Sequence, residues 1–401
     1  MNDRFREAAA LACRPADLLN RYQPGSNLFV SAQRAVLTHG AETILRQATQ
    51  QGLAQAATAV LADASRDGLP APMLIGAVPF RGDQPAHLVL PAGAMLGFGL
   101  GSSPLMAEQW QAPIPPIGPL AVRCTPSPVG YQQLVSNALS QIRDRLMEKV
   151  VLSRSMTVDA TVDIPSLLAR LAIRSPRGYT FAIEHGETRP STLVGASPEL
   201  LLSRRGKLIM SNPLAGSVPR SGDPVEDQRR IEALQQSAKD RHEHALVVDA
   251  VAEALRPYCR NLHIPVGPSL LSTPTMWHLS TEITGELIDP AVNSLEIALA
   301  LHPTPAIGGY PTEPARQFIL DHEGFDRGLF TGLVGWCDAS GDGEWAVTIR
   351  CAEVTEQDVT VFAGAGVVAG STPLSELNET SAKLRTMLSA MGLEAALEQT
   401  A

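Results

Sequence analysis

The sequence predicts an α+β fold, in which large antiparallel β-sheets are flanked by helices. Two observations favour this class. Strand-like segments follow one another in neighbouring runs and do not alternate strictly with helical segments. These segments are apolar on one face and mixed on the other, as in an antiparallel sheet with one covered face. No repeat with a period of about 20–50 residues occurs, which argues against a solenoid or a propeller.

The N-terminal third mixes helical and strand-like segments. Residues 41–64 are rich in Ala, Gln and Leu and predict a helix, whereas 27–31 and 73–80 predict short strands. Residues 111–128 are proline-rich, and proline continues neither a helix nor a central strand, so we interpret them as a surface connector. The predicted organisation is one unit, 1–401, made of an N-terminal α/β subregion, 1–120, and a core, 128–391.

The core is predicted to hold most of the regular structure. Asp223 is a plausible N-cap and Pro224 the first residue of a long helix, and Gly206 suits the turn of a hairpin. The expected helices are 130–147, 224–256 and 373–391, and the expected strand regions are 150–158, 179–185, 191–211 and 328–363.

Composition excludes several classes of protein. The chain has 401 residues, 44% of them hydrophobic and 18% charged, so a disordered chain is excluded. A net charge of −9 lacks the basic footprint of nucleic-acid binding, and we expect no nucleic-acid partner. No run of about 18 uncharged apolar residues occurs, so we expect no membrane span. The charged N-terminal segment lacks the apolar stretch of a secretory signal, and we expect a cytoplasmic location.

Three suggestive patterns carry little weight. The five cysteines are far apart and form no CxxC pair, so reduced thiols are expected. Gly364-x-Gly366-x-x-Ala369 fits a dinucleotide fingerprint, but no acid for the ribose follows about 20 residues on. His242 and His244 point to different sides of a helix and cannot share one metal ion. Walker and GxSxG motifs are absent from the sequence.

Carboxylates on two predicted helices are candidates for chemistry. Glu243 heads the apolar stripe of its helix, where a carboxylate is costly unless it is paired or bound to a metal. Glu376, Glu379 and Lys383 lie on one face of the last helix. Two carboxylates one turn apart suit Mg²⁺, but a Glu379–Lys383 pair on a solvated face explains the same spacing. Both interpretations stay open from spacing alone.

Two single residues stand where apolar strands begin. Lys149 precedes the run VVLS, and Glu199 precedes LLL. A glutamate entering an apolar strand acquires a raised pKa, which a general acid requires. An ordinary solvated lysine and a paired surface glutamate are the competing interpretations.

Nine segments, in order over about 240 residues, resemble the chorismate-utilising enzyme family. The N-terminal segment MLIGAVPF (73–80) also resembles isochorismate synthases that supply catecholate siderophores. The family fold has large antiparallel sheets flanked by helices, with the site between them. The nine segments are KVVLSR (149–154), GASPELL (195–201), PLAGSVPR (213–220), KDRHEHALVVD (239–249), MWHLSTEITG (276–285), LHPTPAIGGYP (301–311), FTGLVGWCDASGDGEWAVTIRCAEV (330–354), AGAGVVAGS (363–371) and ETSAKL (379–384).

The resemblance implies a substrate, a metal and a reaction. Family members bind chorismate with Mg²⁺ and share an SN2″-like displacement, in which a nucleophile attacks C2, the double bonds shift and the C4 hydroxyl leaves. Lys149 matches the base that activates water, and Glu199 matches the acid that protonates the departing hydroxyl.

Further roles are implied by the same matches. Glu243 and Glu379 match direct Mg²⁺ ligands, and Glu376 matches a carboxylate near the metal. Arg350 and Lys383 match groups that meet the substrate carboxylates. The remaining matches are the backbone of Gly216 and Ser217 for the ring carboxylate, Gly364 and Gly366 beside the pyruvyl end, and His278 near the ring.

Within the family, the resemblance favours an isochorismate synthase. The ammonia-using anthranilate synthases lack a lysine at the position of Lys149. Ala215 stands where aminodeoxychorismate synthases carry a nucleophilic lysine. Salicylate synthases have Thr and Tyr where Ala306 and Phe330 stand, so the missing hydroxyls should leave the reaction at isochorismate. The alternatives are a salicylate synthase and a menaquinone-pathway isochorismate synthase. A transient contact with a downstream isochorismatase is also expected.

Overall fold

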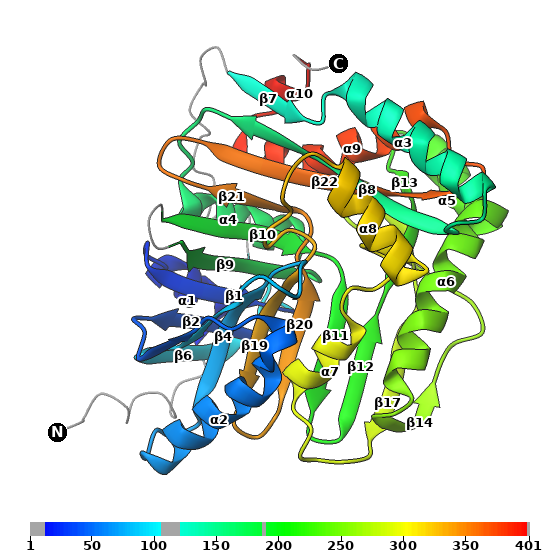
Figure 1. The fold of residues 1–401 in the computed structure, drawn as a ribbon. Helices are drawn as coiled ribbons and strands as arrows, with labels where there is room; N and C mark the ends of the chain where they lie inside the picture. Colours follow the sequence, from blue (N-terminus) through cyan, green and yellow to red (C-terminus); the bar gives the residue numbers. More distant parts are fainter. Residues whose placement is uncertain (1–12, 106–120, 187–189, 399–401) are drawn as a thin grey trace.

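The computed structural model describes residues 13–105, 121–186 and 190–398. Two large sheets face each other across a layer of apolar side chains, and helices cover their outer faces (Figure 1). The strands within each sheet pair antiparallel, which confirms the predicted fold class. In the described parts of the chain, no helix combines the length and the apolar character needed to cross a membrane.

Within the described residues, the first sheet has ten strands and joins the N-terminal region to the core. Strand β7 (Val122–Thr125) pairs with β8 at one end of the sheet. The other nine, in order across the sheet, are β18 (Gly309–Tyr310), β8 (Lys149–Val158), β22 (Val359–Val368), β21 (Cys351–Val354), β10 (Ser191–Ser197), β9 (Tyr179–His185), β1 (Ser26–Val30), β2 (Arg34–His39) and β6 (Gly93–Phe98).

The second sheet has nine strands in the described parts of the chain and again includes N-terminal ones. A separate small sheet of three strands, β13 (Leu214–Pro219), β16 (Met276–Ser280) and β15 (Ser269–Ser272), stands beside it. The nine strands in order are β14 (Cys259–His263), β17 (Ile283–Leu287), β12 (Leu208–Asn212), β11 (Leu200–Arg205), β20 (Gly343–Val347), β19 (Leu333–Asp338), β4 (Met73–Val78), β5 (His87–Leu90) and β3 (Thr43–Leu45).

The helices pack on the outer faces of the sheets. Helix α4 lies on β9 and β10, α9 on β22, α6 on β13, and α7 on β11 and β20. In bounds, the helices are α1 (Pro15–Arg21), the short 3₁₀ turn η1 (Thr49–Gln51), α2 (Leu53–Arg66), α3 (Pro128–Arg143), α4 (Ile164–Arg174), α5 (Pro224–Gln236), α6 (Ala238–Leu255), α7 (Ser294–Leu301), α8 (Thr312–His322), α9 (Pro373–Met391) and α10 (Ala395–Glu398).

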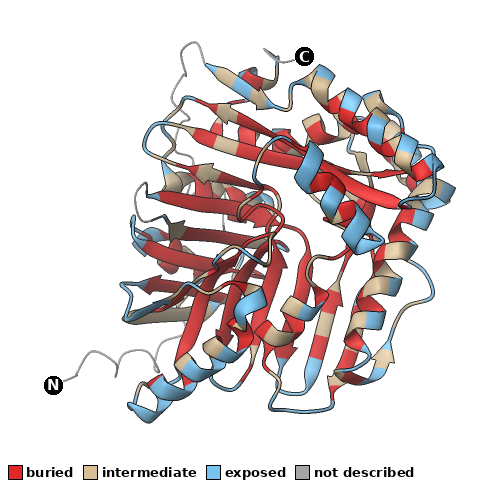
Figure 2. Ribbon diagram, in the orientation of Figure 1, coloured by how far each residue is buried: buried red, intermediate tan, exposed pale blue. Residues whose placement is uncertain are grey.

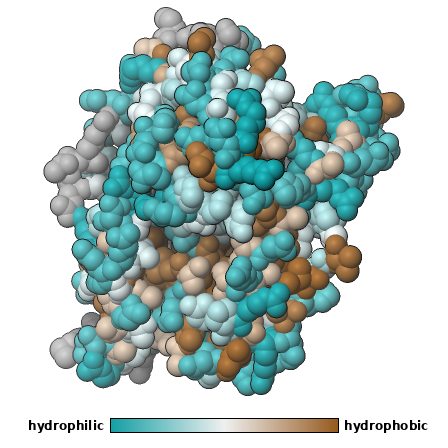
Figure 3. Space-filling model, turned by 45° about the vertical axis from the view of Figure 1, so that its right-hand side comes forward, coloured by the Kyte–Doolittle hydropathy of each residue, from teal (hydrophilic) through white to brown (hydrophobic). Residues whose placement is uncertain are grey.

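The central strands are buried on both faces (Figure 2). The expectation of one covered and one mixed face is therefore wrong for them. One face packs against the opposite sheet, through residues such as Phe181 and Trp336, and the other packs against helices. On the face shown in Figure 3, polar side chains dominate, with apolar residues between them in smaller patches.

Several predicted elements need correction. The helix predicted over 41–64 is wrong in its first part, where β3 pairs with β5 and Gly52 adopts a left-handed φ of 84° before α2 begins. The helix predicted over 224–256 is interrupted at Ser237, whose side chain caps α6. Part of the predicted connector forms β7, while its residues 111–120 lie outside the described ranges.

Other local predictions are confirmed. The Asp223 side chain accepts a hydrogen bond from Val225 N, and Pro224 begins α5. Gly206, with φ 58°, lies in the turn between β11 and β12. No disulfide joins any of the five cysteines. The division into 1–120 and 128–391 stays a prediction.

Candidate active site

The chain crosses between the two large sheets at two neighbouring points. Glu199 lies between β10 of the first sheet and β11 of the second, and Arg350 lies between β20 of the second and β21 of the first. Backbone hydrogen bonds hold the crossings together, from Ala196 N to Arg350 O and from Val347 N to Glu199 O, each 3.1 Å. Two predicted site residues thus come from the same seam of the fold.

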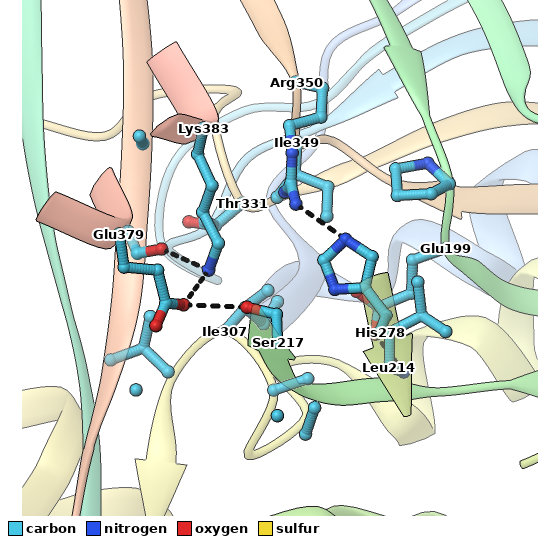
Figure 4. Close-up of a pocket in the computed structure, with 18 of the residues that line it drawn as sticks. Glu199, Leu214, Ser217, His278, Ile307, Thr331, Ile349, Arg350, Glu379 and Lys383 are labelled. Carbon is cyan, nitrogen blue, oxygen red and sulfur yellow. Dashed lines mark hydrogen bonds and ion pairs between the residues drawn. The ribbon is translucent and has the colours of Figure 1, made fainter. Parts of the chain in front are cut away.

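A cavity at this seam gathers most of the predicted site residues (Figure 4). They reach it from both sheets, the small sheet, and helices α6 and α9. The predicted residues that line the cavity are Glu199, Gly216, Ser217, Glu243, His278, Ala306, Phe330, Arg350, Gly364, Gly366, Glu379 and Lys383.

The other two predicted residues stand directly behind its lining. The Lys149 Nζ lies 2.9 Å from Glu243 Oε1, and its side chain has no exposed surface. A solvated lysine is therefore excluded at this position. Gly366, on β22, leaves room for this pair, because a Cβ there would collide with Glu243 and crowd the Lys149 side chain. Glu376 lies one helical turn before Glu379 in α9.

Each of the three predicted metal-site carboxylates is paired with a lysine. Besides the Lys149–Glu243 pair, Lys383 Nζ lies 2.6 Å from Glu379 Oε1 and Lys239 Nζ lies 3.0 Å from Glu376 Oε1. The Glu379–Lys383 pair expected from the helical spacing is thus present, but it faces the cavity and not solvent. Figure 4 shows the same Glu379 oxygen accepting from Ser217 Oγ, at 3.0 Å.

The two carboxylates on α9 respond differently to burial. Burial and the neighbouring Glu379 charge raise the pKa of Glu376 to about 7, although Lys239 opposes this. Burial also pushes the pKa of Glu379 upward, but the charge and hydrogen bond of Lys383 outweigh it and hold that pKa below its ordinary value. Glu379 is consequently the more fully ionised of the two at neutral pH.

Glu199 has the properties of a proton donor. It is 3% exposed, and burial raises its pKa to about 7 despite a hydrogen bond from Leu214 N and the charges of Arg350 and Lys149. A carboxyl with this pKa holds a proton on a large fraction of molecules near neutral pH. The structure thus bears out the raised pKa expected where a glutamate enters an apolar strand.

His278 is neutral beside a buried arginine. Burial, with the charges of Arg350 and Lys383, lowers its pKa well below the ordinary value. The neutral ring can accept a hydrogen bond from the Arg350 guanidinium, whose terminal nitrogen lies 3.2 Å from His278 Nε2 (Figure 4). Arg350 itself adopts a left-handed φ of 51°, which is uncommon for a residue with a side chain and typical of functional sites.

The donor chemistry of the helix side fits Mg²⁺. Carboxylate oxygens are the ligands this ion prefers, and Glu243, Glu379 and Glu376 supply them from two neighbouring helices. Among the described residues, no three His, Cys, Asp or Glu side chains converge closely enough to hold an ion as they stand. The lysines instead supply the positive charge that these carboxylates require.

Sequence reasoning missed three residues at this site. Lys239 and Asp240 lie one turn before Glu243 in α6, and the charges of Glu243 and Glu379 act on both. Their spacing of three and four residues from Glu243 was the available signal. Thr331 lines the cavity with a left-handed φ of 59°, a rare conformation for a β-branched residue that the sequence does not reveal.

The rejected motifs have structural roles. Gly364 and Gly366 lie inside β22 and not in a loop that opens a helix, so they do not form a dinucleotide site. His244 approaches Ala215 O at 3.1 Å and the Thr281 hydroxyl at 2.7 Å, and therefore braces the strand that leads to Gly216.

Comparison with known proteins identifies the family. Residues 112–392 match the family described as chorismate binding enzyme. The chain belongs to the chorismate-binding enzyme family. A curated member, isochorismate synthase DhbC of Bacillus subtilis, is 50% identical over 387 residues, which cover 94% of this chain and 96% of the relative.

Solved structures of family members agree with the fold. The putative 2,3-dihydroxybenzoate-specific isochorismate synthase DhbC of Bacillus anthracis superposes with a TM-score of 0.88 at 45% identity, covering 94% of this chain and 99% of that one. MenF, the menaquinone-specific isochorismate synthase of Escherichia coli, superposes with a TM-score of 0.75 at 26% identity, covering 92% and 90%.

Proposed function

We propose that this chain is an isochorismate synthase, which converts chorismate reversibly to isochorismate. The observation that carries the proposal is the buried Glu199, with a pKa of about 7, in a cavity that Lys383 and Arg350 also line. An acid that is half protonated at neutral pH can both give and take the proton of a hydroxyl, which a reversible exchange of hydroxyl groups requires. The high identity to DhbC supports the same reaction.

In the proposed reaction, Lys149 acts in its neutral form, having given up one proton, and takes a proton from water while the water oxygen bonds to C2. The two ring double bonds shift by one position, the C4–oxygen bond breaks, and Glu199 gives its proton to the departing hydroxyl, which leaves as water. One water enters and one leaves, so the product is an isomer of the substrate. Arg350 and Lys383 would hold the substrate carboxylates, with the neutral His278 orienting Arg350.

We propose that Glu243 and Glu379 hold Mg²⁺ directly, with Glu376 close by. When bound, the ion supplies positive charge that offsets a substrate carboxylate. Each of these carboxylates is paired with a lysine, so a carboxylate that binds the ion must first release its lysine. Release from Glu243 would free Lys149 to meet water, and release from Glu379 would free Lys383 to meet a substrate carboxylate.

The reaction should stop at isochorismate. Ala306 and Phe330 line the cavity without a hydroxyl, and Phe330 stacks on Phe362 with ring centroids 5.0 Å apart. The absence of polar groups at these two positions removes contacts that elimination of the pyruvyl group would need. We therefore place the salicylate synthase alternative second.

The identity to DhbC supports a role in siderophore supply over a menaquinone pathway. A cytoplasmic location and transient contact with an isochorismatase remain predictions.

The first test is product analysis. Purified protein is incubated with chorismate and either Mg²⁺ or EDTA, products are separated by HPLC, and pyruvate is followed with a lactate dehydrogenase couple. A Mg²⁺-dependent mixture of chorismate and isochorismate without pyruvate is expected, whereas stoichiometric pyruvate would contradict the proposal.

A further inference from the structure

A second cavity adjoins the candidate active site on the side of Arg350. Its volume is about 370 Å³, and both Pro198 and Arg350 line the two cavities. Its walls come from the turn after α4, the end of β13, the turn between β15 and β16, and α9. The rim residues Arg177 and Ser272 are exposed, whereas Arg350 at its inner end is buried, so the cavity leads inward from the surface.

Positive charge dominates this second cavity. None of the described residues that line it is acidic, and four are arginines, Arg174, Arg177, Arg220 and Arg350. Within the described ranges, Arg177 makes no ion pair, and Arg220 Nε stands 3.7 Å from Asp227 Oδ2, longer than a hydrogen bond. In a chain of net charge −9, a cluster of this kind creates a local field that attracts anions.

Arg350 connects this field to the reaction site. Arg350 is only 7% exposed, and its Nε has no hydrogen-bond partner among the described residues. A buried donor without an acceptor is unfavourable, so a carboxylate that arrives at Arg350 supplies the missing partner. The arginines therefore extend from Arg177 at the rim, which is exposed and makes no ion pair within the described ranges, to the buried Arg350 at the boundary of the active site, whose Nε lacks an acceptor.

We propose that the second cavity is a capture site for the dicarboxylate substrate, which then passes Arg350 into the active site. This inference rests on the proposed function, because that function supplies the dianionic ligand. Arg174 and Arg177 act as steering charges in this proposal and take no part in the chemistry. Their contribution belongs to the encounter of enzyme and substrate, and it should weaken when salt screens the charges.

The test uses charge reversal at the rim and a matched reversal elsewhere. Arg177→Glu and Arg174→Glu are compared with Lys207→Glu, which changes net charge equally but lies in the β11–β12 turn. Conversion of chorismate is measured at about 20 mM and about 500 mM ionic strength. We expect Arg177→Glu to lower kcat/KM at least about fivefold at low salt relative to Lys207→Glu, with kcat within about twofold of the parent. At high salt the difference should largely disappear.

A second variant tests passage independently of charge. Ser272 is exposed at the rim, and Ser272→Trp would narrow the cavity without changing net charge. This variant should lower kcat/KM at both salt concentrations and leave kcat unchanged. If Arg177→Glu and Lys207→Glu behave alike at low salt and Ser272→Trp matches the parent, the capture site is refuted while the enzyme activity stands. If the parent protein does not convert chorismate, the proposed function fails and this inference fails with it.

Discussion

The two walls of the active-site cavity hold their charges in different ways. On the helix wall, Glu243, Glu379 and Glu376 each stand within 3.0 Å of a lysine. On the sheet wall, Glu199 and Arg350 form no ion pair within the described ranges. The helix wall is suited to exchange one cation for another, whereas the sheet wall is suited to hold a proton or await an anion. Among the described residues, buried charge is thus paired on one side of the cavity and left without an ion pair on the other.

The largest expected effect comes from removing the proton on the sheet wall. Glu199→Gln should lower kcat by about 10²–10⁴, the usual contribution of a positioned acid. Turnover is followed by HPLC. Glu344→Gln is the matched control, because Glu344 is equally buried on β20 and has a raised pKa through burial but lies away from the cavity. Near-parental turnover by Glu199→Gln would contradict its role as the acid.

Lys149→Ala should lower kcat over the same range, about 10²–10⁴, because the base that activates water is lost. This variant also removes the ion pair, at 2.9 Å, between Lys149 on β8 and Glu243 on α6. Lys207→Ala, in an exposed turn, serves as the control. Retained turnover would place the base elsewhere in the molecule.

A smaller effect is expected on the helix wall itself. Glu379→Gln should raise the Mg²⁺ concentration needed for half-maximal turnover by about tenfold or more, because a hard oxygen ligand loses its charge. Glu376→Gln should produce a smaller shift, since Glu376 does not line the cavity and is bound to Lys239. Equal Mg²⁺ titrations for the parent and both variants would remove these residues from the metal site.

The smallest effect concerns stability. The folded pKa of Glu199 is about 7 against an ordinary 4.5, so the folded state keeps a proton that the unfolded state loses between these values. Stability is therefore lost as pH rises from about 4.5 to 7, by at most about 3 kcal/mol. Glu199→Gln removes this cost, and its Tm should exceed that of the parent by more at pH 8 than at pH 5. A pH-independent difference in calorimetry would contradict the raised pKa.

Most of the predicted site residues line one cavity, whereas two of the predicted helices needed correction. Lys149, Glu199 and the α9 residues belong to motifs that stay local in the chain. The helix expected over 41–64 failed because β3 pairs with β5, a contact between segments far apart in sequence. Ser237 interrupts the long helix expected over 224–256 because its side chain supplies a cap, a local signal that the continuous polar pattern obscured.

The lysine partners on the helix wall were hidden for a different reason. The Lys383–Glu379 pair lies within one helix and follows from spacing, whereas Lys149 and Lys239 meet glutamates from other elements. Such pairings depend on how α6, α9 and β8 are packed, which periodicity does not specify. The same applies to the left-handed backbone at Arg350, where the chain crosses from β20 to β21, and at Thr331, just before β19.

The placement of the N-terminal strands has a consequence for how the chain can be shortened. Strand β1 pairs with β9, and β4 pairs with β19, so that Val78 stands opposite Leu333 from the other end of the molecule. A fragment limited to 128–391 would leave β9 and β19 as open edges with unpaired backbone groups. Open edges recruit strands from other chains, so such a fragment should self-associate, visible as light scattering, while the intact chain stays dispersed. Trimming this protein to its catalytic motifs would expose two templates for aggregation.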